Sequence, residues 1–395
     1  MKEKLITFSK KNRLLILVIL IAVFTLFLSF YKNYQPKNET VQAFSASACR
    51  NLTGIYKEHC WSDLFDVVLK EQGLEAGFDL LGTLYSQDPA FAANCHQYAH
   101  KLGEKAYSLF GENKEIAASA KASYCGYGFY HAFMEKLLVS GKPITVAKKF
   151  CYSVGQNLAS SNKLAPLACF HGIGHGLLED IPNPVIVGND KTTIAKPLTL
   201  CNEISSVEEE VSRCASGVFN VLAIYYANPK TGLKINSVDP YAICRTVSRE
   251  SMATACYDQM NTIIMSITND FLKAATFAEN VSEDQFAQAA VHGLSSVFAK
   301  SLTTSEMARD CQSIQSRLVN SCLEGFALGL VEIGKPGAEH TEAIKLCGEV
   351  SLTQEARDYC FAKVIWSISV SYPQEEASKI CNGLGDYKNK CLESL

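Results

Sequence analysis

Apolar residues recur along most of the chain with the spacing of an α-helix. The segments EEEVSRCASGVFNVLAIYYA (208–227) and TACYDQMNTIIMSI (254–267) show this spacing, and few runs alternate with a period of two. A period of about 3.6 residues predicts amphipathic helices, whereas strict alternation would predict strands. Prolines stand between the apolar runs, where we expect helices to end. They are Pro143, Pro166, Pro182, Pro184 and Pro197.

A short motif, C-x-x-G-x-x-[H/N/L], recurs within these helical segments. It begins at Cys125 (CGYGFYH), Cys169 (CFHGIGH), Cys214 (CASGVFN) and Cys322 (CLEGFAL), and FAQAAVH at Phe286 fits loosely with phenylalanine in place of cysteine. The cysteines that occupy this position, with Phe286 counted among them, recur roughly every 30 to 45 residues after Cys125. A period in this range predicts a tandem array of helical hairpins.

The sixteen cysteines support the same repeat. An even count outside a reducing compartment is typical of disulfides, and we expect each cysteine to pair with its neighbour in sequence order. No CxxC is present, which argues against zinc ribbons and thioredoxin-like redox sites. The expected pairs are 49/60, 95/125, 151/169, 201/214, 244/256, 311/322, 347/360 and 381/391.

The predicted fold is therefore all-α. It consists of tandem disulfide-stapled helical hairpins, similar to α-solenoids or α/α-toroids, behind an N-terminal transmembrane helix. Glycine costs about 1 kcal/mol in a helix interior relative to alanine, but small residues allow neighbouring backbones to approach closely. We expect that role for Gly128, Gly172, Gly217 and Gly325.

The N-terminal sequence predicts a signal anchor. Residues 14–30 carry no charge and follow Lys2, Lys4, Lys10, Lys11 and Arg13. This length is at the short end for a membrane span, and the basic residues predict a cytoplasmic tail at 1–13 with the rest of the chain outside. A cleaved signal is the alternative, because ASA at 46–48 resembles a peptidase site, but it lies far from the apolar run.

The remaining organisation follows from composition. Residues 31–47 are polar, which predicts a tether between the membrane and the rest of the chain. We expect the protein to cross the membrane once, with residues 48–395 forming an extracytoplasmic repeat domain. Within this domain the repeats at 90–185 are rich in histidine and glutamate, and those at 200–395 are expected to be structural. The formal net charge of −3 offers no basic surplus for phosphates, so we expect no nucleic-acid partner.

Most of the eight histidines occupy regular positions on the predicted helices. His96, His100 and Glu104 are spaced four apart, and His171, His175 and Glu179 repeat that spacing. His131 with Glu135 matches the last two members. Positions four apart lie on one helix face, so each pair offers two nitrogens to one ion. His292 stands six residues after Phe286, as His131 and His175 stand six after their cysteines, with Asn220 in that position of an intervening repeat.

A second position, two residues after the cysteine or Phe286, is also mostly polar. Together the two positions predict a polar stripe on otherwise apolar helices, and buried polar groups cost free energy unless they are paired. The residues at this second position are Tyr127, His171, Ser216, Asp258, Gln288 and Glu324.

These patterns predict a centre for a divalent transition metal, with Zn, Fe, Mn or Cu as candidates. The predicted ligands are His96, His100, His131, His171, His175 and His292, and the predicted catalytic carboxylates are Glu104, Glu135 and Glu179. A thermolysin-like peptidase is disfavoured because Gln97 and Gly172 replace the general-base glutamate of HExxH. The alternative is that the histidines only bridge a glycine-rich helix interface.

We therefore expect a membrane-anchored, extracytoplasmic, metal-dependent enzyme with hydrolytic or oxidative chemistry. Two other functions fit the same sequence. A disulfide-stabilised repeat module can bind a protein partner on its surface without catalysis, and the histidines can bind a metal or haem without turnover.

Overall fold

The computed structural model describes residues 49–111, 119–179 and 190–395. Within these ranges the regular elements are α-helices and short 3-10 helices, and the predicted all-helical fold is confirmed. The chain divides into the units Met1–Leu52 and Thr53–Leu395, and the helices discussed below belong to the second.

The predicted anchor falls outside this description. Residues 1–13, 14–30 and 31–47 are not among the described residues. Of the helices that are described, none combines the length and the apolar character that crossing a membrane requires.

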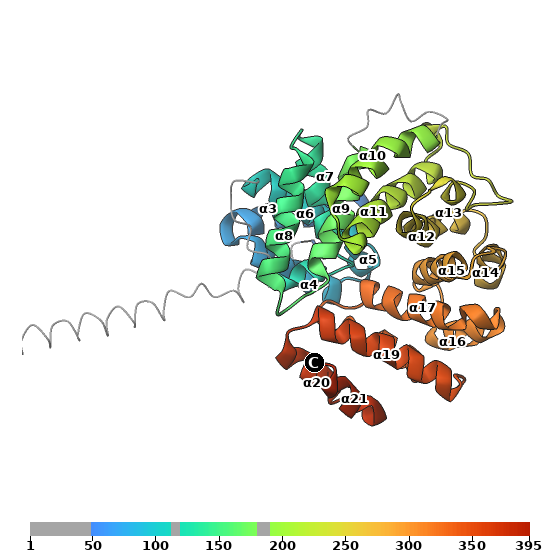
Figure 1. The fold of residues 1–395 in the computed structure, drawn as a ribbon. Helices are drawn as coiled ribbons and strands as arrows, with labels where there is room; N and C mark the ends of the chain where they lie inside the picture. Colours follow the sequence, from blue (N-terminus) through green and yellow to red (C-terminus); the bar gives the residue numbers. More distant parts are fainter. Residues whose placement is uncertain (1–48, 112–118, 180–189) are drawn as a thin grey trace, which may run out of the picture. The chain divides into compact units, whose positions relative to one another are not determined.

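Eight of the described helices form what we call the central series, because each packs against the next. Figure 1 shows them from cyan through green and orange to red. They are α6 (Cys95–Phe110), α7 (Gly128–Val139), α9 (Ala165–Glu179), α11 (Glu208–Ala227), α12 (Glu250–Gln259), α15 (Asp284–Phe298), α17 (Val319–Ile333) and α19 (Gln354–Ser371).

The other described α-helices flank this series, and several pack directly on one of its members, as α8 does on α9 and α16 on α17. Flanking and central helices alternate from α7 to α11 and from α15 to α20, as in a hairpin repeat, but α6 and α7, and α11 and α12, are consecutive central helices. The flanking helices are α3 (Gly54–Gln72), α4 (Leu74–Gln87), α5 (Pro89–Ala93), α8 (Ile144–Leu158), α10 (Asp190–Ile204), α13 (Asn261–Met265), α14 (Phe271–Glu279), α16 (Thr304–Ser313), α18 (Thr341–Cys347), α20 (Gln374–Cys381) and α21 (Lys388–Glu393).

Disulfides staple flanking helices to central ones. Cys151 on α8 is bonded to Cys169 on α9, and the same arrangement joins α10 to α11 and α16 to α17. Seven bridges follow the predicted sequence order. Cys49 and Cys60 are also disulfide-bonded, and no cysteine among the described residues is free. Each staple is worth about 2–4 kcal/mol, and this density of disulfides indicates an oxidising environment.

Glycines allow the central helices to touch backbone to backbone. A Cβ atom at Gly217 of α11 would overlap the carbonyl oxygen of His171 on α9, and one at Gly174 would overlap that of Cys214. A Cβ at Gly172 would lie 2.5 Å from the carbonyl oxygen of Tyr130 on α7. Even alanine therefore cannot fit at these crossings without moving a helix.

The proline prediction holds in part. Pro143 immediately precedes α8, and Pro166 lies in the first turn of α9, but Pro197 lies inside α10. A proline there removes one backbone hydrogen bond and usually breaks a helix. The Cys201–Cys214 bridge fixes α10 to α11 beyond the proline, which explains why the helix continues. Pro182 and Pro184 lie outside the described residues.

Contacts also join helices that are far apart in the central series. The Tyr85 hydroxyl on α4 donates a 2.9 Å hydrogen bond to the carbonyl oxygen of Ile333 on α17. The amide of Lys163, which precedes α9, donates a 2.7 Å bond to the carbonyl oxygen of Val370 on α19. The later helices are therefore tied to the early ones.

Candidate metal centre

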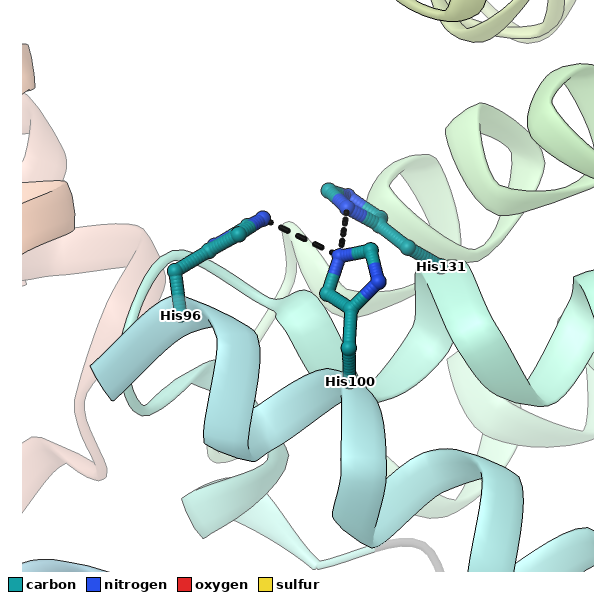
Figure 2. Close-up of side chains that lie close together, drawn as sticks. All are labelled: His96, His100 and His131. Atoms are coloured by element: carbon teal, nitrogen blue, oxygen red, sulfur yellow. Dashed lines mark hydrogen bonds between the residues drawn. The ribbon is translucent and has the colours of Figure 1, made fainter. Parts of the chain in front are cut away.

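Helices α6 and α7 bring three imidazole rings together. The Nε2 atom of His100 lies 3.1 Å from Nε2 of His96 and 3.2 Å from Nδ1 of His131, and Figure 2 shows the three rings converging. His96 and His100 share one face of α6 because they are four residues apart. His131 comes from α7, which packs on α6. We call these residues the first triad.

Helix α9 adds a second pair beside His131. The Nε2 atoms of His171 and His175 are 3.1 Å apart. The ring centroids of these two residues lie 4.7 and 4.6 Å from that of His131. Within each set of three, the ligand atoms all lie within 4.8 Å of one another. We call His131, His171 and His175 the second triad. Five of the six histidines predicted as ligands are thus brought together in space.

The outward nitrogens of three of these rings have their own partners. His96 Nδ1 lies 2.8 Å from the carbonyl oxygen of Cys125, His171 Nδ1 lies 3.0 Å from Ser216 Oγ, and His175 Nδ1 lies 2.9 Å from a carboxylate oxygen of Glu135. Histidines that bind metals usually donate their second ring N–H to a carbonyl or carboxylate in this way. These bonds point the Nε2 atoms inward.

The backbone that accepts the His96 bond is held in an uncommon conformation. Cys125 has a φ of 57° and Tyr127 a φ of 59°. Left-handed backbone costs roughly 1–2 kcal/mol for a residue with a Cβ atom. Strain of this kind is often found at functional sites, and here it accompanies a carbonyl group that fixes the orientation of His96.

Burial favours the neutral form of four of these histidines in the metal-free protein. Desolvation lowers the pKa of His96 to about 4 and that of His100 to about 3. It also lowers the pKa of His131 and His171 well below the ordinary value, and the neighbouring imidazoles add to the effect. A metal binds neutral imidazole, so these rings are in the form that coordination requires.

The three predicted carboxylates occupy different environments. Burial raises the pKa of Glu135, but the hydrogen bond from His175 lowers it below its usual range. Burial and the charge of Glu135 raise the pKa of Glu179, to which the Tyr225 hydroxyl donates a hydrogen bond. Glu104 forms a 2.6 Å ion pair with Lys136 and is about half exposed, so the structure does not bring it into the cluster.

His292 also lies apart from both triads. Its Nδ1 atom is 2.7 Å from a carboxylate oxygen of Asp258. These two residues line a cavity of about 280 Å³ together with Arg213 and Ser216. Gln288 and Glu324 of the predicted polar stripe also line this cavity, so part of that stripe surrounds one cavity. Ser216 connects this cavity to the cluster because it also hydrogen-bonds His171.

Two partners of the histidines could not be assigned from the sequence. The position of the Cys125 carbonyl group depends on a left-handed turn that no sequence pattern predicted. The Asp258–His292 pair involves positions that had each been placed on the polar stripe, but their contact depends on the crossing of α12 and α15.

The titration order of the histidines provides a first test. Burial lowers the pKa of His292, but the charge of Asp258 outweighs this and raises it above the ordinary value. In the metal-free protein we therefore expect His292 to stay protonated to a higher pH than His96 and His100. A pH titration of the imidazole NMR signals measures this order, with His292→Gln used to assign the resonance. A His292 signal that titrates below that of His96 would contradict the geometry of the pair.

The arrangement has the chemistry of a transition-metal site. Each triad presents inward nitrogens from two helices that can bind an ion, and an adjoining cavity can admit a small molecule. Comparisons with protein-family models, curated proteins and solved structures found no match.

Proposed function

We propose that this chain is a membrane-anchored, extracytoplasmic protein whose histidine cluster binds a divalent transition metal and supports metal-dependent catalysis. The observation that carries the metal assignment is the first triad. Its three inward nitrogens come from two helices, and the outward nitrogen of His96 already has the partner expected of a metal ligand.

The spacing of these nitrogens supports the assignment. Two nitrogens that each lie about 2.05 Å from one tetrahedral ion are separated by roughly 3.3 Å, and their ring centroids by roughly 5.2 Å. The nitrogen separations from His100 are 3.1 and 3.2 Å. The centroid separations are 4.8, 5.2 and 5.2 Å. Modest side-chain movement would therefore suffice to bind an ion.

If the three histidines of the first triad served only to pack the helices together, their nitrogen–nitrogen contacts would be harder to explain. A neutral His96 that donates from Nδ1 to the Cys125 carbonyl has a bare lone pair on Nε2. His100 Nε2 faces this lone pair and also Nδ1 of His131, but a single N–H can be aimed well at only one of them. A cation among the three nitrogens would satisfy them all.

The types of ligand limit which metal ions can bind. Imidazole suits Zn, Cu and Fe, and nearby carboxylates extend the choice to Mn. Glu135 would orient His175, as carboxylates behind metal-bound histidines do. Glu179 is the better candidate for a proton donor, because it lies one turn beyond His175 and its pKa is raised by burial.

The cavity beside His171 supports a catalytic role. Its hydroxyl, amide, carboxylate and guanidinium groups would hold a small polar substrate. A metal ion near that substrate would activate water or polarise a substrate oxygen. Asp258 and His292, paired at 2.7 Å, would then position the substrate or transfer protons. Hydrolytic and oxidative chemistry are both compatible with this arrangement.

The location and the finer architecture are part of the proposal. Residues 14–30 would anchor the chain in the cell membrane with residues 1–13 in the cytoplasm, and the disulfides would form on the outer side. The bonds from α4 to α17 and from Lys163 to α19 favour a closed α/α-toroid of hairpins over an open solenoid.

Two alternative functions involve no catalysis. The repeat surface can bind a protein partner, in which case the histidines stabilise the helix crossings only. The cluster can also bind a metal or haem without turnover.

Metal analysis separates these functions. We expect the purified full-length chain to retain at least one transition metal ion per molecule by plasma mass spectrometry after dialysis. His100→Ala should lose the ion of the first triad, because His100 contacts both other members of that triad. His340→Ala is the matched control, since His340 bonds Tyr372 instead. Equal and negligible metal in all three proteins would overturn the proposal.

A separate experiment tests whether the bound metal supports catalysis. If the metal-loaded protein hydrolyses or oxidises model substrates, Asp258→Asn should lose turnover while it keeps its metal. Full metal occupancy with no turnover on any substrate would favour binding without catalysis.

A further inference from the structure

The five clustered histidines divide into two sets that share one residue. His96 and His100 lie on α6, His171 and His175 lie on α9, and His131 on α7 belongs to both triads. The proposed function requires only one ion at the first triad. The second triad has no role in that proposal.

The pair on α9 is built like the pair on α6. The two Nε2 atoms are 3.1 Å apart in each case. On α9 both Nδ1 atoms have partners, Ser216 Oγ at 3.0 Å and Glu135 at 2.9 Å. The inward nitrogens of α9 are therefore held at least as firmly as those of α6.

One ion cannot serve both pairs. Nitrogens bound to a single ion can be no farther apart than twice the bond length, about 4.2 Å. The described histidines approach one another within 4.8 Å in two sets of three, and neither set contains members of both pairs.

His131 is placed to contribute to both sets. Its Nδ1 atom faces His100 at 3.2 Å. Its ring also lies 4.7 Å from that of His171 between centroids and stacks on that of His175 at 4.6 Å, with 22° between the ring planes, so the His131 ring would have to turn for its second nitrogen to face an ion held by the α9 pair. An imidazole has a second nitrogen, and that of His131 has no hydrogen-bond partner among the residues the structure describes.

We infer that the cluster is a two-ion centre in which the imidazole of His131 bridges the metals. One ion is held by His96, His100 and Nδ1 of His131, and the other by His171, His175 and Nε2 of His131. The inference rests on the proposed metal function and adds the second ion and the bridge. Binding both ions displaces the remaining ring proton of His131 to solvent, and the bridged ions lie roughly 6 Å apart at ordinary bond lengths.

Stoichiometry tests the second ion. The full-length chain is stripped with a chelator and loaded with Zn²⁺, and bound zinc is counted after dialysis. We expect two ions per chain in the wild type, and one in each of His96→Ala/His100→Ala and His171→Ala/His175→Ala. His292→Ala should keep both, since His292 lies outside both triads. The paired glutamine variants repeat the count where an alanine pair reduces helical content.

Copper tests the bridge. An imidazolate between two Cu²⁺ ions couples their spins, so the EPR spin count at low temperature should fall well below the copper content in the wild type. The count should equal the copper content in either pair variant.

The outcomes are distinct from those of the metal proposal itself. One ion per wild-type chain overturns the two-ion centre and leaves the metal function in place, whereas no ion overturns both. Two ions with a full spin count overturn the His131 bridge. Loss of an ion in His292→Ala places the second ion elsewhere and also overturns the inference.

Discussion

Replacement of Gly217 by alanine is expected to destabilise the protein by about 1–3 kcal/mol, the usual range for overpacking, and to reduce its metal content. The new Cβ atom would overlap the carbonyl oxygen of His171, and it would also lie 2.9 Å from the amide nitrogen of His175. Helix α9 would have to move away from α11, and it carries His171 and His175, two of the three histidines of the second triad. Urea unfolding and metal analysis of the same preparation measure the two effects.

Gly155→Ala is the matched control. Gly155 also lies inside a helix, but its Cβ atom would make an ordinary 3.4 Å contact with Pro166. Because alanine favours helix over glycine by up to about 1 kcal/mol, this variant should be as stable as the wild type or slightly more stable. If the two variants unfold at the same urea concentration, the close crossing of α9 and α11 is not as described.

Saturation with zinc is expected to raise the free energy of unfolding by about 2.7 kcal/mol for each bound ion when free zinc is one hundred times the Kd of that site. The ligands come from α6, α7 and α9, so they are close together only in the folded chain. Unfolding would separate them and release the ions. Thermal or urea unfolding at fixed free zinc concentrations, with the disulfides intact, provides the measurement.

His131→Ala should largely remove this stabilisation, because His131 belongs to both triads. His340→Ala should leave it unchanged. An equal zinc-dependent shift in the wild type and His131→Ala would mean that zinc binds the folded protein at another place.

The helices and the order of the disulfides were predictable because the information for them is local. The helical period, the cysteine spacing and the glycines lie within single hairpins, and the disulfide order follows from chain neighbours. Pro197 was placed at a helix end because a proline usually breaks a helix. The structure keeps it inside α10, where packing and a disulfide override local preference.

The candidate site was predictable only where its residues share a register. Spacing placed His96 with His100 and His171 with His175, and the position six after the cysteine brought in His131. The same rule also selected His292, but α15 packs between α12 and α17, so that residue pairs with Asp258 of α12 instead. Glu104 has the right helix spacing, yet it lies farther along α6 and pairs with Lys136.

The order of the disulfides has a consequence for biosynthesis. The seven bridges with assigned partners close loops of only 10 to 30 residues. If the cysteine-bearing part of the chain crosses the membrane in sequence order, each hairpin can therefore be completed soon after it emerges, before the next cysteine pair arrives. Oxidation in step with export limits wrong pairings, and the protein should depend little on a disulfide isomerase to reach its native bridges. The bond between Tyr85 and Ile333 spans 248 positions, so it can form only when most of the chain has been delivered.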